Sequence, residues 1–354
     1  MKISNLLLVF LFFLFTIPNV KAKDFSESCI VIDQDSGRIL YQNNAQEPKL
    51  IASTTKILTA IITIEKANLN QEVEVGEEVL KMYGTNIYLE VGEKIKIIDL
   101  LYGLLLRSGN DAAVVLAKNV SGSEEKFVAD MNKKAQELGM KNSIFNNPHG
   151  LDEETKNYST AYDMALLMRY ASKNQTFMKI SNTKKYQTST GKKTYLWYNR
   201  NKLLTSYEYC TGGKNGYTPS AGKTLVSTAT KDNLNLIIVS LKDQDPYTTH
   251  KNLYNQIFNQ YQNYQIINKD NFYIDKTFIN EDLYIKDNFY YPLTLEETTK
   301  VKTIVNINNK SKSKKPGKIT IYLNNKKIGS IPIYKKIPTK KEETFFSKLK
   351  SFFT

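Results

Sequence analysis

The chain has 354 residues, which is enough for two ordinary domains with sizeable cores, and it carries a formal net charge of +14. Its two cysteines, Cys29 and Cys210, and two histidines, His149 and His250, are too few for a disulfide scaffold. They also lack the spacing of a familiar zinc site, so we expect neither a metal nor a cofactor. The two cysteines could pair, but their apolar, strand-like surroundings favour reduced, buried thiols.

The first segment has the pattern of a secretory signal peptide. Lys2 precedes an apolar run over 6–17, and the triplet 20–22 resembles a signal-peptidase site, so residues 1–22 are predicted to be removed. An uncleaved N-terminal anchor is the alternative. Either way, we expect an exported protein at the outer face of the cytoplasmic membrane or in the cell wall. The basic charge would then meet anionic lipids and wall polymers rather than nucleic acid, or would simply reflect compositional bias.

The next part of the chain mixes strands and helices. The segments 30–33 and 37–41 predict a β-hairpin, and Ser123 is the predicted N-cap of a helix. Apolar residues at helical spacing predict helices over 53–67, 97–106, 111–119, 124–138 and 162–171, and β-branched runs predict strands over 223–228 and 234–241. This composition indicates an α+β domain over residues 23–255.

A second region begins near residue 260 and contains short strand patterns without a helical period. The predicted strands are 272–274, 283–285, 301–307, 319–323 and 328–333, with a hairpin turn at Asn324-Asn325. Residues 260–336 are therefore predicted to form a small all-β domain. The tail, 337–354, carries Phe345, Phe346, Leu349, Phe352 and Phe353 on one helical face. We expect this tail to lie on the membrane surface, with packing on its own protein as the alternative.

Ser53-Thr54-Thr55-Lys56 is the first motif that suggests chemistry. A hydroxyl and an amine three residues apart at a helix start share one face, so the pair can act as nucleophile and base. The spacing alone is weak evidence, because Ser123/Lys126, Ser181/Lys184 and Ser347/Lys350 share it.

Two further motifs follow in the chain. Ser108-Gly109-Asn110 falls between two predicted helices, where a hydroxyl and a carboxamide can project into a cleft. Lys214-Asn215-Gly216 follows Gly212-Gly213 and is expected to begin a strand, where the glycines would let an extended peptide approach the strand edge.

The order and context of these three motifs resemble the penicillin-binding protein and serine β-lactamase superfamily. Longer stretches are similar to the low-molecular-weight D-alanyl-D-alanine carboxypeptidases. These stretches are 51–60, 106–113, 147–152, 158–163 and 213–218, with Ala221-Gly222 close behind. The resemblance covers roughly residues 25–335. It implies a transpeptidase-like α+β domain, in which an antiparallel sheet is flanked by helices with a helical subdomain, followed by a small all-β domain.

The resemblance also implies roles for individual residues. Ser53 would attack the D-Ala-D-Ala carbonyl, Lys56 would activate it, and Ser108 would relay a proton to the leaving amine. Asn110 would bind the substrate amide, and Lys214, Asn215 and Gly216 would belong to the carboxylate-binding strand. The backbone N–H of Ser53 and one from the strand after Gly216 would form the oxyanion hole. His149, within 147–152, is interpreted as part of a structural loop.

The implied substrate is the peptidoglycan stem pentapeptide, and β-lactam antibiotics would be covalent inhibitors. Asn215 departs from the family pattern, where a threonine is usual. A DD-endopeptidase shares the same motifs and stays open, as does a catalytically weak penicillin-binding wall module. A β-lactamase is disfavoured, because the Glu-x-x-Leu-Asn stretch of class A enzymes is missing from the sequence.

Overall fold

The computed structural model describes residues 26–275, 281–308 and 313–336. The predicted signal peptide and membrane-surface tail therefore lie outside the described residues. Within the described ranges, no helix combines the length and the apolar character needed to cross a bilayer.

The larger domain is built on a five-stranded antiparallel sheet with the order β2-β1-β11-β10-β9. The strands are β1 (Ser26–Asp33), β2 (Ile39–Asn43), β9 (Cys210–Thr218), β10 (Gly222–Lys231) and β11 (Leu234–Asp243). The predicted hairpin and the two later strands are confirmed. Because β1 pairs with β11, the start of the domain is joined to its last strand, and β9 is left at an edge.

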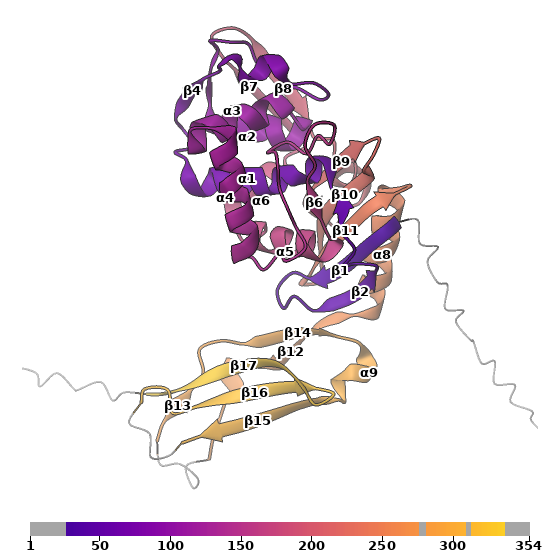
Figure 1. The fold of residues 1–354 in the computed structure, drawn as a ribbon. Helices are drawn as coiled ribbons and strands as arrows, with labels where there is room; N and C mark the ends of the chain where they lie inside the picture. Colours follow the sequence, from indigo (N-terminus) through magenta and orange to yellow (C-terminus); the bar gives the residue numbers. More distant parts are fainter. Residues whose placement is uncertain (1–25, 276–280, 309–312, 337–354) are drawn as a thin grey trace, which may run out of the picture.

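Alternation along the strands gives the sheet two buried faces. Ile30 and Ile32 of β1 belong to the larger core, which is shared with the helices. Cys29 and Val31 face a second core on the other side, which is covered by α8 (Pro246–Gln260). Cys29 and Cys210 are not joined by a disulfide, and Cys210 is only partly buried. In Figure 1, α8 covers one face of the sheet while α1 and α5 lie on the other.

The predicted helices are confirmed, with shifted ends. They are α1 (Lys56–Lys66), α2 (Ile97–Tyr102), α3 (Asn110–Ser121), α4 (Glu124–Glu137) and α5 (Ala161–Ala171). Ser123 caps α4 by accepting a hydrogen bond from the N–H of Lys126. The two longest helices that were missed are α8 and α6 (Gln175–Asn182), because their sequences are rich in Asn, Gln and Thr and their apolar positions are few.

Short elements complete the larger domain. They are β3 (Lys49–Leu50), β4 (Glu72–Glu74), β5 (Lys94–Lys96), β6 (Tyr158–Ser159), β7 (Lys185–Ser189), β8 (Thr194–Tyr198) and α7 (Leu203–Ser206). Two short 3₁₀ helices are η1 (Ala52–Thr55) and η2 (Glu77–Lys81), and a short π-helical turn is η3 (Gly103–Arg107).

The smaller domain is all β except for two short turns. Its elements are β12 (Gln262–Ile267), η4 (Lys269–Asn271), β13 (Leu283–Tyr284), β14 (Phe289–Leu293), α9 (Leu295–Thr298), β15 (Val301–Ile307), β16 (Gly317–Leu323) and β17 (Lys326–Lys335). Asn324 and Asn325 both have positive φ, which confirms the predicted hairpin turn. The predicted strand 272–274 is wrong: it follows the η4 turn and pairs with no strand.

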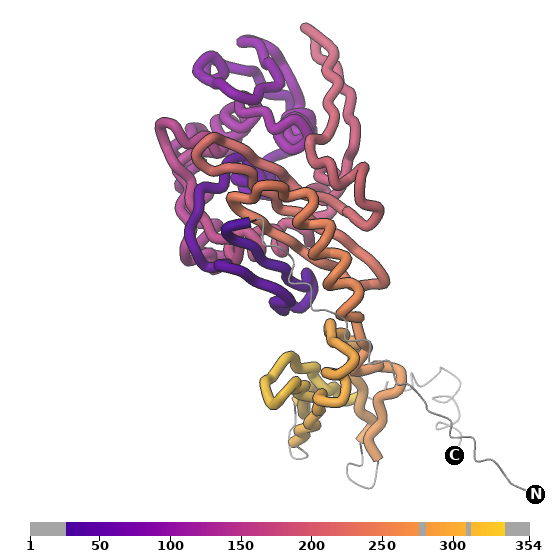
Figure 2. The backbone as a smooth tube through the Cα atoms, turned by 90° about the vertical axis from the view of Figure 1, so that its right-hand side faces the viewer, coloured from indigo at the N-terminus to yellow at the C-terminus, as the bar shows by residue number. Residues whose placement is uncertain are grey.

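The two domains meet around Arg38. Its guanidinium pairs with Glu297 at 2.5 Å, donates to the Pro292 carbonyl and lies over the rings of Tyr261 and Tyr291. Figure 2 shows the chain leaving the larger domain at the end of α8 and entering the smaller one. The contact therefore involves the α9 and β14 end of the smaller domain.

Candidate active site

Ser53 lies in η1, a single turn that precedes α1. Its predecessor, Ala52, has φ +46°, an uncommon value for a residue with a side chain. Thr54 closes the turn by donating from Oγ1 to the Ile51 carbonyl at 2.6 Å. Thr54, Thr55 and Lys56 are buried, whereas Ser53 is partly exposed. The turn thus presents the Ser53 hydroxyl to solvent from an otherwise closed surface.

Lys56 is fully buried, and its Nζ has three oxygen neighbours. The distances are 3.1 Å to Ser53 Oγ, 2.7 Å to Asn110 Oδ1 and 2.5 Å to the His149 carbonyl. A neutral amine has two N–H donors and one lone pair. Two of the oxygens can accept those hydrogens, which leaves the lone pair for the Ser53 O–H.

Ser108 and Asn110 are positioned by an irregular end to the preceding helix. The helix α2 continues into η3, a π-helical turn, and Ser108 follows it with φ +69°. Such turns and strained residues often occur at functional sites. Asn110 begins α3, and its Nδ2 donates to the Tyr83 carbonyl at 2.7 Å, so its Oδ1 is turned towards Lys56.

Lys214, Asn215 and Gly216 lie on the edge strand β9. The strand begins at Cys210, so these residues lie in its middle rather than at its start as predicted. The Nζ of buried Lys214 donates to the Asn215 carbonyl at 2.6 Å, and the Asn215 side chain is half-buried. A Cβ on Gly216 would lie 2.8 Å from the backbone nitrogen of Ser53, so this glycine lets the strand approach η1 closely.

The two glycines before this motif pack closely against the protein itself. A Cβ on Gly212 would lie 2.2 Å from Ser181 Oγ, and one on Gly213 would lie 2.3 Å from the Val226 carbonyl. They therefore make room for α6 and β10, which are elements of the same protein.

The loop 147–152 packs beneath the turn that carries Ser53. Asn147 Oδ1 accepts hydrogen bonds from the N–H groups of His149 and Gly150. His149 Nδ1 accepts from the Leu151 N–H, and burial lowers the pKa of His149 to about 3. Its Nε2 lies 3.9 Å from Glu124, too far for a hydrogen bond, so the ring is neutral near pH 7. The contribution of His149 to the site is its backbone carbonyl.

Burial and neighbouring cations shift both lysines towards their neutral forms. Burial, followed by the charge of Lys214, holds the pKa of Lys56 well below its usual range. Burial, followed by the charge of Arg200, lowers the pKa of Lys214 to about 7. Arg200 was not recognised from the sequence, because it lies in a loop without a motif. Its backbone N–H donates to the Leu106 carbonyl, and its Nη1 donates to Thr85 Oγ1.

The arrangement supplies the parts needed for acyl transfer. It combines an accessible hydroxyl, an adjacent amine of lowered pKa, and a strand edge beside a backbone N–H. His/Cys/Asp/Glu groups suited to holding a metal ion are not found among the described residues.

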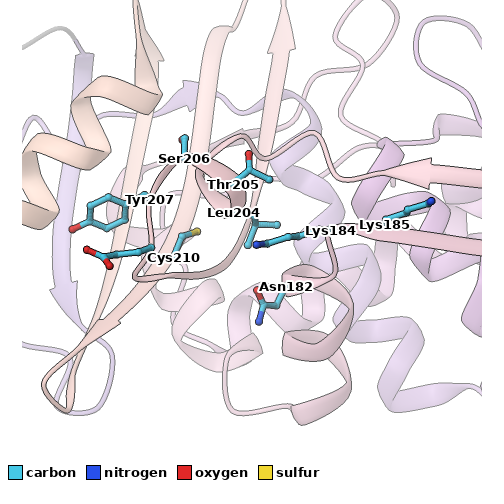
Figure 3. A pocket seen from close by; sticks show the side chains of 9 residues that line it. Asn182, Lys184, Lys185, Leu204, Thr205, Ser206, Tyr207 and Cys210 are labelled. Atoms are coloured by element: carbon cyan, nitrogen blue, oxygen red, sulfur yellow. The ribbon is translucent and has the colours of Figure 1, made fainter.

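A pocket also lies elsewhere in the larger domain, away from Ser53. Its volume is about 880 Å³ and it lies between the α6–β7 segment and α7. Figure 3 shows its side chains, which include Lys184, Leu204 and Cys210. Since none of its lining residues is a candidate site residue, its size gives no reason to place the chemistry there.

The chain belongs to the D-alanyl-D-alanine carboxypeptidase family, whose model matches residues 17–245. It is 40% identical over 221 residues to the D-alanyl-D-alanine carboxypeptidase DacF of Bacillus subtilis (strain 168), covering 60% of this chain and 56% of the relative. It is 34% identical over 248 residues to DacC of Escherichia coli (strain K12), covering 63% of this chain and 57% of that relative. The matched part thus spans little more than half the length of these curated relatives.

A solved structure is similar over both domains. The crystal structure of penicillin binding protein 5 from Haemophilus influenzae matches with a TM-score of 0.74 at 27% identity. The match covers 89% of this chain and 97% of that one. The fold is therefore the α+β fold of the DD-peptidases followed by a small β domain, as the sequence predicted.

Proposed function

We propose that this protein is a serine-type D-alanyl-D-alanine carboxypeptidase that removes the terminal D-alanine from peptidoglycan stem pentapeptides. The observation that carries the proposal is the 3.1 Å separation of Ser53 Oγ from the Nζ of a buried lysine whose pKa is lowered. Family membership supplies the substrate class, since the matched relatives are named for this activity.

The first half of the reaction forms an acyl-enzyme. The Oγ of Ser53 attacks the carbonyl carbon of the D-Ala-D-Ala bond, and its proton passes to the neutral amine of Lys56. The oxyanion accepts hydrogen bonds from the backbone N–H of Ser53 and from an N–H of β9 beyond Gly216. Collapse breaks the C–N bond, and the leaving amine takes through Ser108 the proton that Lys56 had accepted, which returns Lys56 to its neutral form. Free D-alanine departs, and the remaining peptide is an ester on Ser53.

The second half is hydrolysis of that ester. Water attacks the ester carbonyl while Lys56 accepts its proton, and the Ser53 oxygen leaves and takes that proton back from Lys56. The products are the shortened peptide acid and the original enzyme. The buried position of Lys56 supports its use as a base in both halves, because burial favours the neutral amine.

Substrate binding uses the free edge of β9. An extended peptide can pair with an edge strand, which places its carbonyl beside η1. Asn110 binds the substrate amide and Lys214 attracts the terminal carboxylate. Asn215 replaces the threonine usual in the family, and we infer that its side-chain amide substitutes for the hydroxyl donor with reduced activity.

Export is part of the proposal, since the substrate lies outside the cytoplasm. Residues 1–22 direct export, and residues 337–354 hold the protein to the outer face of the cytoplasmic membrane, with the β domain as a spacer. These assignments rest on the sequence patterns alone.

The test is release of D-alanine from a pentapeptide ending in D-Ala-D-Ala. We expect release by the native protein and a loss of several orders of magnitude in Ser53→Ala. Ser123→Ala is the matched control, because Ser123 has the same spacing to a lysine but only caps α4. Undiminished release by Ser53→Ala would refute the proposal. Cleavage of cross-linked dimers without release of D-alanine would instead favour the endopeptidase.

A further inference from the structure

The smaller domain carries a basic hollow that has no place in the catalytic proposal. Its volume is about 640 Å³, within the range of ligand sites. We call it the lysine hollow, and its lining residues are Tyr284, Lys286, Lys314, Lys315, Tyr334, Lys335 and Lys336.

Three separate chain segments converge on the lysine hollow. Tyr284 of β13 pairs with Tyr334 of β17, which brings Lys286 beside the end of β17. The N–H of Lys335 donates to the Lys314 carbonyl at 3.1 Å, which fixes the segment before β16 against the same strand end. The convergence of the lysines is therefore a product of the sheet register and not of a lysine-rich run alone.

Two tyrosine rings form a floor for the charges. The rings of Tyr284 and Tyr334 lie 5.5 Å apart. The Nζ atoms of Lys286 and Lys315 lie 4.6 Å and 5.5 Å from the centre of the Tyr334 ring. Cation–π contacts hold both ammonium groups against the Tyr334 ring while leaving their hydrogens available. Glu281 pairs with Lys335, but the described lining itself contains no acidic residue.

The lysine hollow lies away from the larger domain and beside the start of the tail, and this position indicates what it binds. The contact with the larger domain is at α9 and β14, and Figure 1 shows β13 at the opposite end of the smaller domain from α9. Lys336 is the last described residue, and the chain continues from it into 337–354, whose sequence predicts a tail on the membrane surface. Ammonium groups bind phosphate, and tyrosine side chains favour the boundary between headgroups and acyl chains.

We propose that the lysine hollow binds the phosphate headgroups of anionic phospholipids and sets the small domain against the membrane. It acts beside the tail, as a second contact with the same surface. This inference needs export but not catalysis, so the two proposals can fail separately.

The experiment measures sedimentation of the full-length mature chain with phosphatidylglycerol-containing vesicles and with pure phosphatidylcholine vesicles. The variant Lys286→Gln/Lys314→Gln/Lys315→Gln is expected to bind the anionic vesicles roughly a hundredfold more weakly, because three lysines at about 1 kcal/mol each contribute about 3 kcal/mol. The matched control is Lys302→Gln/Lys326→Gln/Lys327→Gln, three exposed lysines at the other end of the same sheet. It should bind within about threefold of the native protein.

Three outcomes would overturn the proposal. Equal losses in both variants would show that only overall charge matters, and no loss in the first would show that the hollow is not used. The third outcome is measured by a parallel titration with soluble poly(glycerol phosphate). If the first variant loses polymer binding but keeps its vesicle binding, the hollow binds a wall polymer instead. The charge-preserving variant Lys286→Arg/Lys314→Arg/Lys315→Arg should bind the anionic vesicles as the native protein does. D-Alanine release from a soluble peptide should be the same in every variant, and melting temperatures report on folding.

Discussion

The Nζ of Lys56 lies 2.7 Å from Oδ1 of Asn110, and the Nδ2 of the same amide donates to the Tyr83 carbonyl. Asn110 therefore orients the amine of Lys56. A neutral oxygen at this position helps to hold the amine without forcing it to stay protonated.

Asn110→Asp is expected to place a carboxylate beside Lys56 and raise the pKa of its amine, because an opposite charge favours the protonated form. The penicillin acylation rate falls at low pH as Lys56 is protonated, and we call this part of the pH profile its acid limb. The acid limb should then move to higher pH, by roughly one to three units. Measuring acylation rates across pH tests this. Asn132→Asp, where the native amide also bonds backbone carbonyls, is the control. An unshifted limb with only a lower rate would contradict this role for Asn110.

Lys214→Met removes a positive charge that disfavours protonation of Lys56. The pKa of Lys56 should rise, so the acid limb of the acylation rate should again move to higher pH. Exposed Lys223→Met serves as the charge-matched control and should leave the limb in place. The affinity for peptides with a free terminal carboxylate should also fall in Lys214→Met only. If both variants give the native pH profile, the two lysines are not coupled.

Gly216→Ala is expected to slow acylation by tenfold or more while the protein still folds. The new Cβ would lie 2.5 Å from Thr224 Oγ1 and 2.8 Å from the backbone nitrogen of Ser53, so β9 must move away from η1. Displacing an oxyanion donor costs about two orders of magnitude or more in an acyl transfer. Gly191→Ala, with open space around its Cα, is the control. Native acylation rates in Gly216→Ala would show that the close approach is dispensable.

His250 should make the fold sensitive to acid. Its ring is fully buried between Ser227 and Ser240, and burial lowers its pKa to about 3. The unfolded chain binds this proton near pH 6.5, so stability is lost as pH falls from about 6.5 towards 3. His250→Gln should be less stable than the native protein at pH 7. The difference should shrink by about 1.4 kcal/mol per pH unit between roughly pH 6 and 4. Urea unfolding across this range measures it, and a constant difference would contradict the burial of a neutral ring.

Much of the architecture could be predicted because its signals are local. The alternation in β1 and the helical spacing in α1 depend on residues that also form the core. The helix α8 was missed because it is anchored by few apolar residues, among them Leu253, Tyr254 and Ile257, within a polar sequence. Its burial depends on the sheet face that it covers, and this information lies far away in the chain.

In the candidate site, too, some groups could be predicted from the sequence and others could not. Ser53, Lys56, Ser108 and Lys214 carry reactive side chains in short motifs, so their types and order could be read from the sequence. Backbone groups have no such signature. The carbonyls of Tyr83 and His149, which hold Asn110 and Lys56, became visible only when the loops were placed. The lysine hollow likewise depends on the pairing of β13 with β17.

The central claim is that Ser53 is the nucleophile, and mass spectrometry after mixing the protein with a penicillin tests it most directly. The account predicts a mass increase of one intact penicillin, located by peptide mapping on the peptide that contains Ser53, with no such increase in Ser53→Ala. An adduct on another residue, or labelling that persists undiminished in Ser53→Ala, would contradict it.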